Sequence, residues 1–135
     1  KKERWFGIRK YKEDLIKQYE WIPKALASKK AENIISIDVS DVSGFTDVFF
    51  ITSSNSDTHM KALLDIVTEA LEAHHVQYVV EGKNSSLWCL IDCGDVIIHI
   101  FSSEGRQFYD LERIWGDAPQ VQFDEEGELV LAVNV

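Results

Sequence analysis

Side chains with useful chemistry gather in one short part of the sequence, on either side of Cys93-Gly94. Two apolar runs, residues 87–92 and 96–101, flank these turn residues and predict a β-hairpin. Such a hairpin would pair Asp92 with Asp95, Leu90 with Ile97 and Trp88 with His99. Because side chains alternate along a strand, one face would carry all six: Trp88, Leu90, Asp92, Asp95, Ile97 and His99. An indole, two carboxylates, an imidazole and two aliphatic groups are typical of a protein-binding surface.

The opposite face of the expected hairpin is entirely apolar and predicts a core. Two like charges facing each other across a turn cost stability, which indicates that Asp92 and Asp95 have a function. The alternative interpretation is a solvated strand face on which Trp88 merely covers an edge.

The sequence offers little support for catalysis or metal binding. Cys89 and Cys93 lack further ligands at a metal-site spacing, and two cysteines suit a reducing compartment. His74-His75 ends an expected helix, where solvated side chains are common. No glycine loop for phosphate is present, and no motif pairs a nucleophile with a base. The residues 53–56, Ser-Ser-Asn-Ser, favour a helix cap over an anion site. We therefore expect no metal and no cofactor.

The elements that would position these residues form an α+β domain. An amphipathic helix is expected over residues 11–29, kinked or divided at Pro23. A second helix is expected over residues 57–74, after a cap at Asn55 or Ser56. A short helical segment is expected over 105–115, where the apolar residues at helical spacing are Phe108, Leu111, Ile114 and Trp115. Strands are expected at residues 33–39, 48–51, 76–80, 87–92 and 96–101. This order predicts a mixed sheet of about five strands covered by helices.

Charge is distributed unevenly along the 135 residues, whose length suits a single compact domain. Residues 1–30 hold ten Lys or Arg and four Asp or Glu, a net charge of +6, and residues 31–135 have a net charge of −15. The acidic part would repel nucleic acid and suits a basic protein partner, although acidic residues also simply favour solubility. No apolar run is long enough for a transmembrane helix, and the charged start predicts no signal peptide, so no membrane partner is expected.

Several segments match one known family in order. They are Lys29-Lys30-Ala31-Glu32-Asn33-Ile34, Thr46-Asp47, Ser56, Lys61-Ala62, Glu81-Gly82, Trp88, Leu90-Ile91-Asp92, Gly94-Asp95-Val96, His99-Ile100-Phe101, Arg106, Tyr109-Asp110-Leu111-Glu112 and Trp115-Gly116-Asp117-Ala118. Over residues 24–119 the chain resembles the Iojap family, the ribosomal silencing factors called RsfS in bacteria.

This resemblance implies a function that composition alone does not show. Family members bind the large ribosomal subunit through its protein L-fourteen, block joining of the small subunit and repress translation when nutrients are scarce. Mitochondrial and chloroplast relatives act in large-subunit assembly. The resemblance therefore implies a cytoplasmic bacterial protein, with an organellar assembly factor as the alternative.

The family fold is similar to the nucleotidyltransferase core but is not catalytic. A nucleotidyltransferase needs a Gly-Ser followed by closely spaced metal-binding carboxylates. Ser53-Ser54 has no such acidic pair on the following strand, so an enzyme of this class is the less favoured alternative. We expect no enzyme.

The hairpin face is expected to be a main contact with the ribosomal protein. Trp88 would be the apolar anchor, Asp92 and Asp95 would meet Lys or Arg, and His99 would complete the patch. A second matching segment contributes residues that either contact the partner or are structural, with Arg106 pairing with a carboxylate. The full expected interface is Trp88, Leu90, Asp92, Asp95, Ile97, His99, Arg106, Tyr109, Glu112 and Trp115.

Three regions are expected: a basic helical extension at 1–23, the family domain at 24–119, and an acidic tail or hairpin at 120–135. The extension would contact ribosomal RNA through Lys1, Lys2, Arg4, Arg9, Lys10 and Lys12. It would otherwise fold back on the acidic body or remain a solvated helix. A homodimer of the free protein is left open.

Overall fold

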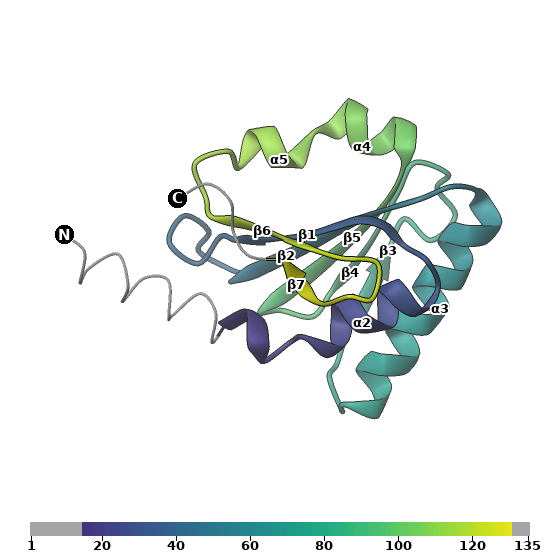
Figure 1. Cartoon of the computed structure of the whole chain (residues 1–135), viewed down its shortest axis with the longest axis horizontal. Coiled ribbons are helices and arrows are strands. Elements are labelled where there is room, and N and C mark those ends of the chain that lie inside the picture. The colour runs from purple at the N-terminus through teal and green to yellow at the C-terminus, as the bar shows by residue number, and fades with distance from the viewer. Residues whose placement is uncertain (1–14, 131–135) are drawn as a thin grey trace.

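In the computed structural model, which describes residues 15–130, the elements form three layers (Figure 1). A sheet lies in the middle, with α2 (Trp21–Ser28) and α3 (Asp57–Ala73) on one side and α4 (Ser103–Tyr109) and α5 (Leu111–Ile114) on the other. The expected α+β class with a mixed sheet is confirmed. Within residues 15–130, every helix is too short or too polar to span a bilayer.

The described sheet has seven strands in the order β3-β4-β5-β2-β1-β6-β7. β2 and β5 are parallel, and all the other neighbours are antiparallel. The strands are β1 (Glu32–Asp38), β2 (Val48–Ser54), β3 (Val79–Glu81), β4 (Trp88–Asp92), β5 (Val96–Ser102), β6 (Gln120–Phe123) and β7 (Leu129–Val130). The five expected strands are present, although β3 begins three residues later than predicted.

Local sequence explains the helices that cover the first face. Ser56 caps α3, since its hydroxyl accepts the N–H of His59 at 3.0 Å. The buried residues of α3 recur at helical spacing and pack on the sheet: Met60, Leu63, Val67 and Leu71. The expected division of the first helix is observed before Pro23: residues 15–17 are helical, 18–20 form a turn, and α2 follows. Pro23 lies in the first turn of α2, where its missing N–H is tolerated.

The residues after Pro119 belong to the same sheet. β6 pairs with β1, and β7 pairs with β6 as a hairpin, so the sheet runs across the boundary expected at residue 119. Gly127, in the β6–β7 turn, has a φ of 79°, and a Cβ there would lie 2.6 Å from Cα of Lys24. This close approach packs the turn against α2, which itself crosses the boundary expected at residue 23.

Each face of the sheet has its own apolar core. The α2–α3 side buries Cys89, Ile91, Val96, Ile98 and Ile100, as the alternation predicts. Leu87, which the alternation also predicts for this core, lies just before β4 and is 38% exposed. The α4–α5 side buries Ile35, Ile37, Val39, Phe49, Ile51, Ile97, Phe101 and Leu111. The second core means that much of the face expected to meet a partner is covered by α4 and α5.

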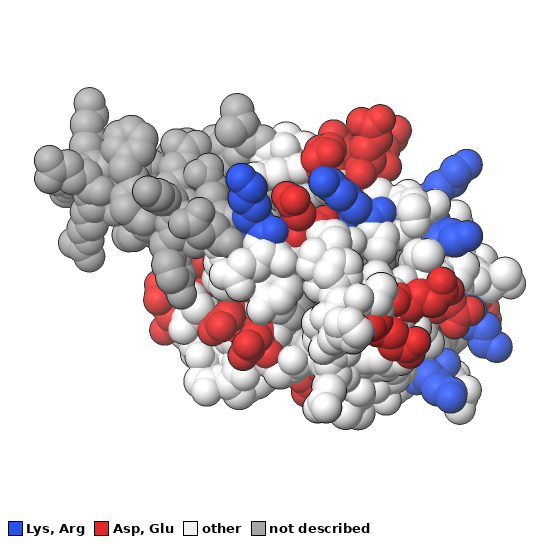
Figure 2. All heavy atoms as spheres, turned by 90° about the horizontal axis from the view of Figure 1, so that it is seen from below, with Lys and Arg blue, Asp and Glu red and all other residues white. Residues whose placement is uncertain are grey.

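Figure 2 shows the α2–α3 side of the molecule, where Asp and Glu side chains form several groups and Lys and Arg lie among them. Residues 15–130 contain eight Lys or Arg and twenty Asp or Glu, a net charge of −12. The acidic character predicted for the body therefore lies within the described structure. The six basic residues expected to contact RNA lie outside it.

Candidate functional site

The β4–β5 hairpin keeps the predicted division into two faces but has a different register. Asp92 lies opposite Ile97, Leu90 opposite His99 and Trp88 opposite Phe101. The predicted pairing was therefore wrong by two residues, because the turn centres on Gly94-Asp95, where Gly94 has a φ of 85°. A shift of two residues leaves the side chains within β4 and β5 on their predicted faces.

Asp92 and Asp95 do not face each other across the ladder. Asp92 is half-buried, and its Oδ1 accepts the N–H of Gly94 at 2.9 Å, which stabilises the turn. Asp95 lies exposed in the turn itself, and its backbone carbonyl accepts the N–H of Asp47 at 2.9 Å. The strain of two opposed carboxylates, which we expected, is absent from this hairpin.

On the α4–α5 side of the sheet, the side chains of β5 are buried and those of β4 are partly exposed. On β5, Ile97 and His99 are only 7% and 4% exposed, so the expectation that both form an accessible patch is wrong. On β4, Trp88, Leu90 and Asp92 are half-buried because they lie at the rim of the layer formed by α4 and α5. The side chains that a partner could reach on this face therefore lie on β4 and on its outer neighbour β3, not on β5.

The edge strand β3 adds two residues to this rim. Val79 pairs with Asp92 and Glu81 with Leu90, so their side chains share the same face of the sheet. Val79 is 62% exposed and Glu81 is also exposed. We call the surface made of Val79, Glu81, Trp88, Leu90 and Asp92 the β3–β4 face. The sequence pattern did not identify Val79 and Glu81, because it predicts a strand at 76–80 but does not show which strand pairs with it.

Trp88 is held at the rim by aromatic contacts. Its ring lies 4.5 Å from that of Tyr109 and 5.1 Å from that of Phe101, between centroids. Its Nε1–H donates to Nδ1 of His99 at 3.1 Å. Burial lowers the pKa of His99 to about 4, so the imidazole is neutral at pH 7.

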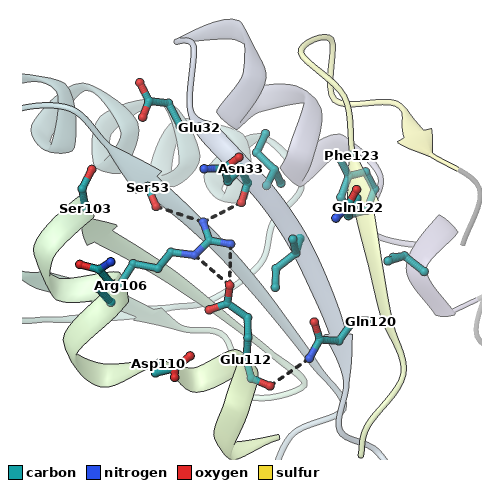
Figure 3. A pocket seen from close by; sticks show the side chains of 14 residues that line it. Glu32, Asn33, Ser53, Ser103, Arg106, Asp110, Glu112, Gln120, Gln122 and Phe123 are labelled. Atoms are coloured by element: carbon teal, nitrogen blue, oxygen red, sulfur yellow. Dashed lines mark hydrogen bonds and ion pairs between the residues drawn. The ribbon is translucent and has the colours of Figure 1, made fainter. Parts of the chain in front are cut away.

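Arg106 holds α4 and α5 against the sheet (Figure 3). Its guanidinium donates to the backbone carbonyl of Asn33 at 2.6 Å, to Oγ of Ser53 at 3.0 Å and to Oε2 of Glu112 at 3.0 and 3.2 Å. These groups lie along a polar pocket of about 800 Å³ between α4, α5, β1 and β6. Figure 3 shows its lining side chains. Arg106 and Glu112 form an ion pair with each other. This geometry favours a structural role for the two residues over direct contact with a partner.

Tyr109 and Trp115 are half-buried against the second core, and Trp115 meets Phe49 edge-on at 5.6 Å. The helical stripe expected over 105–115 is broken at Asp110, which has a left-handed φ of 49° and separates α4 from α5. Phe108 and Ile114 are consequently 78% and 66% exposed, where a continuous helix would have aligned them with Leu111. Their exposure depends on that break, which the periodicity did not predict.

Other residues with reactive or titratable side chains are stacked or partly buried in the fold. His74 stacks on Trp21, with centroids 3.8 Å apart. Burial raises the pKa of the Cys89 thiol, and burial together with the charge of Asp92 raises that of Cys93 to about 11. Burial, followed by the charges of Asp95 and Asp47, also raises the pKa of Tyr19. In the part of the chain that the structure describes, no three His, Cys, Asp or Glu side chains form a group that could hold a metal.

Comparison with known proteins decides the family. The model of the family described as "Ribosomal silencing factor during starvation", RsfS, matches residues 12–133. The chain belongs to the RsfS family. The match begins before and ends after the 24–119 range in which we found the resemblance, consistent with β6 and β7 being part of the sheet.

Individual relatives agree with this membership. The chain is 35% identical over 101 residues to "Ribosomal silencing factor RsfS" of Bacillus subtilis, covering 74% of this chain and 86% of that protein. It is 32% identical over 94 residues to the mouse protein "Mitochondrial assembly of ribosomal large subunit protein 1", covering 67% of this chain and 41% of that one. A crystal structure from Chromobacterium violaceum matches with a TM-score of 0.68 and 32% identity, over 70% of this chain and 80% of that one.

Proposed function

We propose that this chain is a ribosomal silencing factor that binds the large ribosomal subunit through protein L-fourteen and sterically blocks joining of the small subunit. In this proposal it represses translation under nutrient limitation, acts in the bacterial cytoplasm and catalyses no reaction. The single observation that carries the proposal is the match of the RsfS family model to residues 12–133.

The β3–β4 face supports a protein partner of basic character. It combines an exposed Val79, a half-buried indole and leucine, and the carboxylates of Glu81 and Asp92. Apolar groups next to acidic groups suit a partner surface with aliphatic side chains and Lys or Arg. The net charge of −12 over residues 15–130 would steer such a partner toward the protein and repel exposed RNA phosphates.

The expected interface is reduced accordingly. Trp88, Leu90, Asp92 and Asp95 are kept as contacts; Tyr109 borders Trp88, and Trp115 lies half-buried against Phe49. Ile97 and His99 lie beneath the surface, while Arg106 and Glu112 hold the helices in place. As further parts of the proposal we retain a homodimer of the free protein and an RNA contact by residues 1–12, which follows from the basic charge of that segment.

A matched pair of variants tests the face directly. Val79→Lys adds a positive charge at an exposed position of the β3–β4 face, whereas Val130→Lys makes the same change on β7 at the opposite edge of the sheet. We expect the wild type and Val130→Lys to cosediment with purified large subunits and to inhibit subunit joining, and Val79→Lys to do both more weakly. Binding to small subunits in preference to large ones would contradict the proposal.

A second candidate is a large-subunit assembly factor of an organelle, favoured by the similarity to the mouse mitochondrial protein. The two candidates differ in what they do to mature subunits. A silencing factor added to purified, mature subunits lowers the yield of joined ribosomes, whereas an assembly factor acts on immature particles and leaves that yield unchanged.

A further inference from the structure

The hydrogen bond between Trp88 and His99 joins the protein surface to its interior. Trp88 lies half-buried at the rim of the β3–β4 face, whereas His99 is 4% exposed beneath it. The indole Nε1–H donates to Nδ1 of the imidazole at 3.1 Å, and the ring centroids are 5.7 Å apart. A residue this buried cannot itself meet a partner, so any part it plays in binding must act through the residues that it contacts, of which Trp88 lies at the surface.

The protonation of His99 follows from this geometry. Because Nδ1 accepts the indole hydrogen, a neutral imidazole carries its own proton on Nε2. Nε2 is buried and has no hydrogen-bond partner among the described residues. Burial keeps the pKa of His99 well below 7, in agreement with a neutral ring.

An unsatisfied buried N–H costs free energy, which a phenylalanine at this position would avoid. The neighbours of His99 would accept such a ring, since Phe49 lies 4.7 Å from it in an edge-on arrangement and Phe101 lies parallel to it at 6.1 Å. What the imidazole adds to this apolar core is the acceptor at Nδ1. We therefore expect the effect of the imidazole to be on Trp88, the residue whose N–H it accepts.

The ring contacts of Trp88 are less directional than a hydrogen bond. Phe101 and Tyr109 contact the ring of Trp88 through their own rings, contacts that tolerate rotation and sliding. A hydrogen bond at Nε1 is directional and fixes one edge of the indole. We propose that His99 is a positioning residue, which holds the exposed part of Trp88 in one orientation on the β3–β4 face for the ribosomal partner.

This inference rests on the proposed function and adds a mechanism to it. An indole that is already oriented loses less conformational freedom on binding than one that must be ordered by the partner. His99 would thus raise affinity without touching the partner.

Nuclear magnetic resonance of the ¹⁵N-labelled wild-type protein tests the hydrogen bond without any substitution. We expect His99 at pH 7 to be neutral, with its proton on Nε2 and none on Nδ1. A proton on Nδ1, or a charged ring, would overturn the proposal because Nδ1 could not then accept from the indole.

Variants test the positioning itself. His99→Phe keeps a ring in the core but removes the acceptor, and we expect the Trp88 Nε1–H resonance, assigned with Trp88→Phe, to move upfield. His99→Asn places an amide oxygen near the position of Nδ1 and should move the resonance back toward its wild-type value. Ile37→Val, a buried change on the same side of the sheet but on β1, is the matched control and should leave the resonance in place.

Binding to purified large subunits completes the test. We expect His99→Phe to weaken binding by about two- to tenfold, the range for ordering one side chain at an interface. In a Trp88→Ala background the same change should have no further effect, because its action passes through the indole. Losses that simply add, an unmoved indole resonance, or unchanged affinity of His99→Phe would each overturn the positioning role alone. Failure of the wild type to bind large subunits would overturn the proposed function as well.

Discussion

Arg106 and Glu112 form an ion pair of 3.0 Å that bridges the break between α4 and α5. The side chains are 12% and 31% exposed, and the same guanidinium also bonds to Asn33 and Ser53 on the sheet. Two short helices that bury only Gly105 and Leu111 are thereby fixed over one face of the sheet.

We expect Arg106→Ala to destabilise the protein by about 2 kcal/mol, because it leaves Glu112 and the carbonyl of Asn33 without their donor. The free energy of unfolding in urea measures this loss. Arg113→Ala, an exposed arginine on α5, is the matched control and should change stability by less than about 0.5 kcal/mol. Equal effects of the two variants would show that the network around Arg106 contributes little.

Trp88→Ala should weaken large-subunit binding by about 1–3 kcal/mol, as expected for an aromatic anchor at an interface. The substitution also removes contacts with Phe101 and Tyr109, so the unfolding free energy must be measured alongside the affinity. A variant that is folded by circular dichroism and binds like the wild type would remove Trp88 from the interface.

Neutralising Asp92 and Asp95 should lower affinity by about 1 kcal/mol in total and reduce its dependence on salt. Asp92→Asn keeps an oxygen for the N–H of Gly94, so the turn is preserved in the double variant Asp92→Asn/Asp95→Asn. The control neutralises two exposed carboxylates of α3, Asp65→Asn/Glu69→Gln. Identical salt slopes for the two double variants would contradict a specific role for the hairpin carboxylates.

The buried imidazole of His99 should make stability depend on pH. Its pKa is about 4 in the folded protein against an ordinary value of 6.5, so between these values the unfolded chain binds a proton that the folded protein does not. Stability should therefore fall as the pH is lowered, with His99 contributing a loss of about 2 kcal/mol between pH 7 and pH 5. Urea unfolding at both values should show a smaller loss for His99→Phe than for the wild type. An equal loss of stability in both proteins would mean that groups other than His99 cause the pH dependence.

Deleting residues 1–12 tests the RNA contact proposed for the basic start of the chain. The deletion removes Lys1, Lys2, Arg4, Arg9, Lys10 and Lys12, so phosphate contacts by these groups predict weaker binding and a shallower salt dependence. Binding to large subunits is titrated at several salt concentrations. Unchanged affinity and slope would show that the segment has no ribosomal role.

Sequence by itself determined the features that depend on local backbone geometry. Alternation along β4 and β5 assigned Cys89 and Ile91 to one face and Trp88 and Leu90 to the other, because successive side chains of a strand must point in opposite directions. The start of α3 was likewise predictable from the Ser56 cap and its apolar stripe. The family resemblance also rested on short local segments.

Only the tertiary structure decided which of these faces a partner can reach. His99 shares its face with Trp88, yet it is buried, on the side of the sheet where the bond between Arg106 and Asn33, residues far apart in the sequence, holds α4 and α5. The pairing of Val79 with Asp92 and the break at Asp110 likewise depend on contacts and backbone angles that no local pattern specifies. Period-two alternation fixes the side of a strand, but burial is a property of whatever else packs against that side.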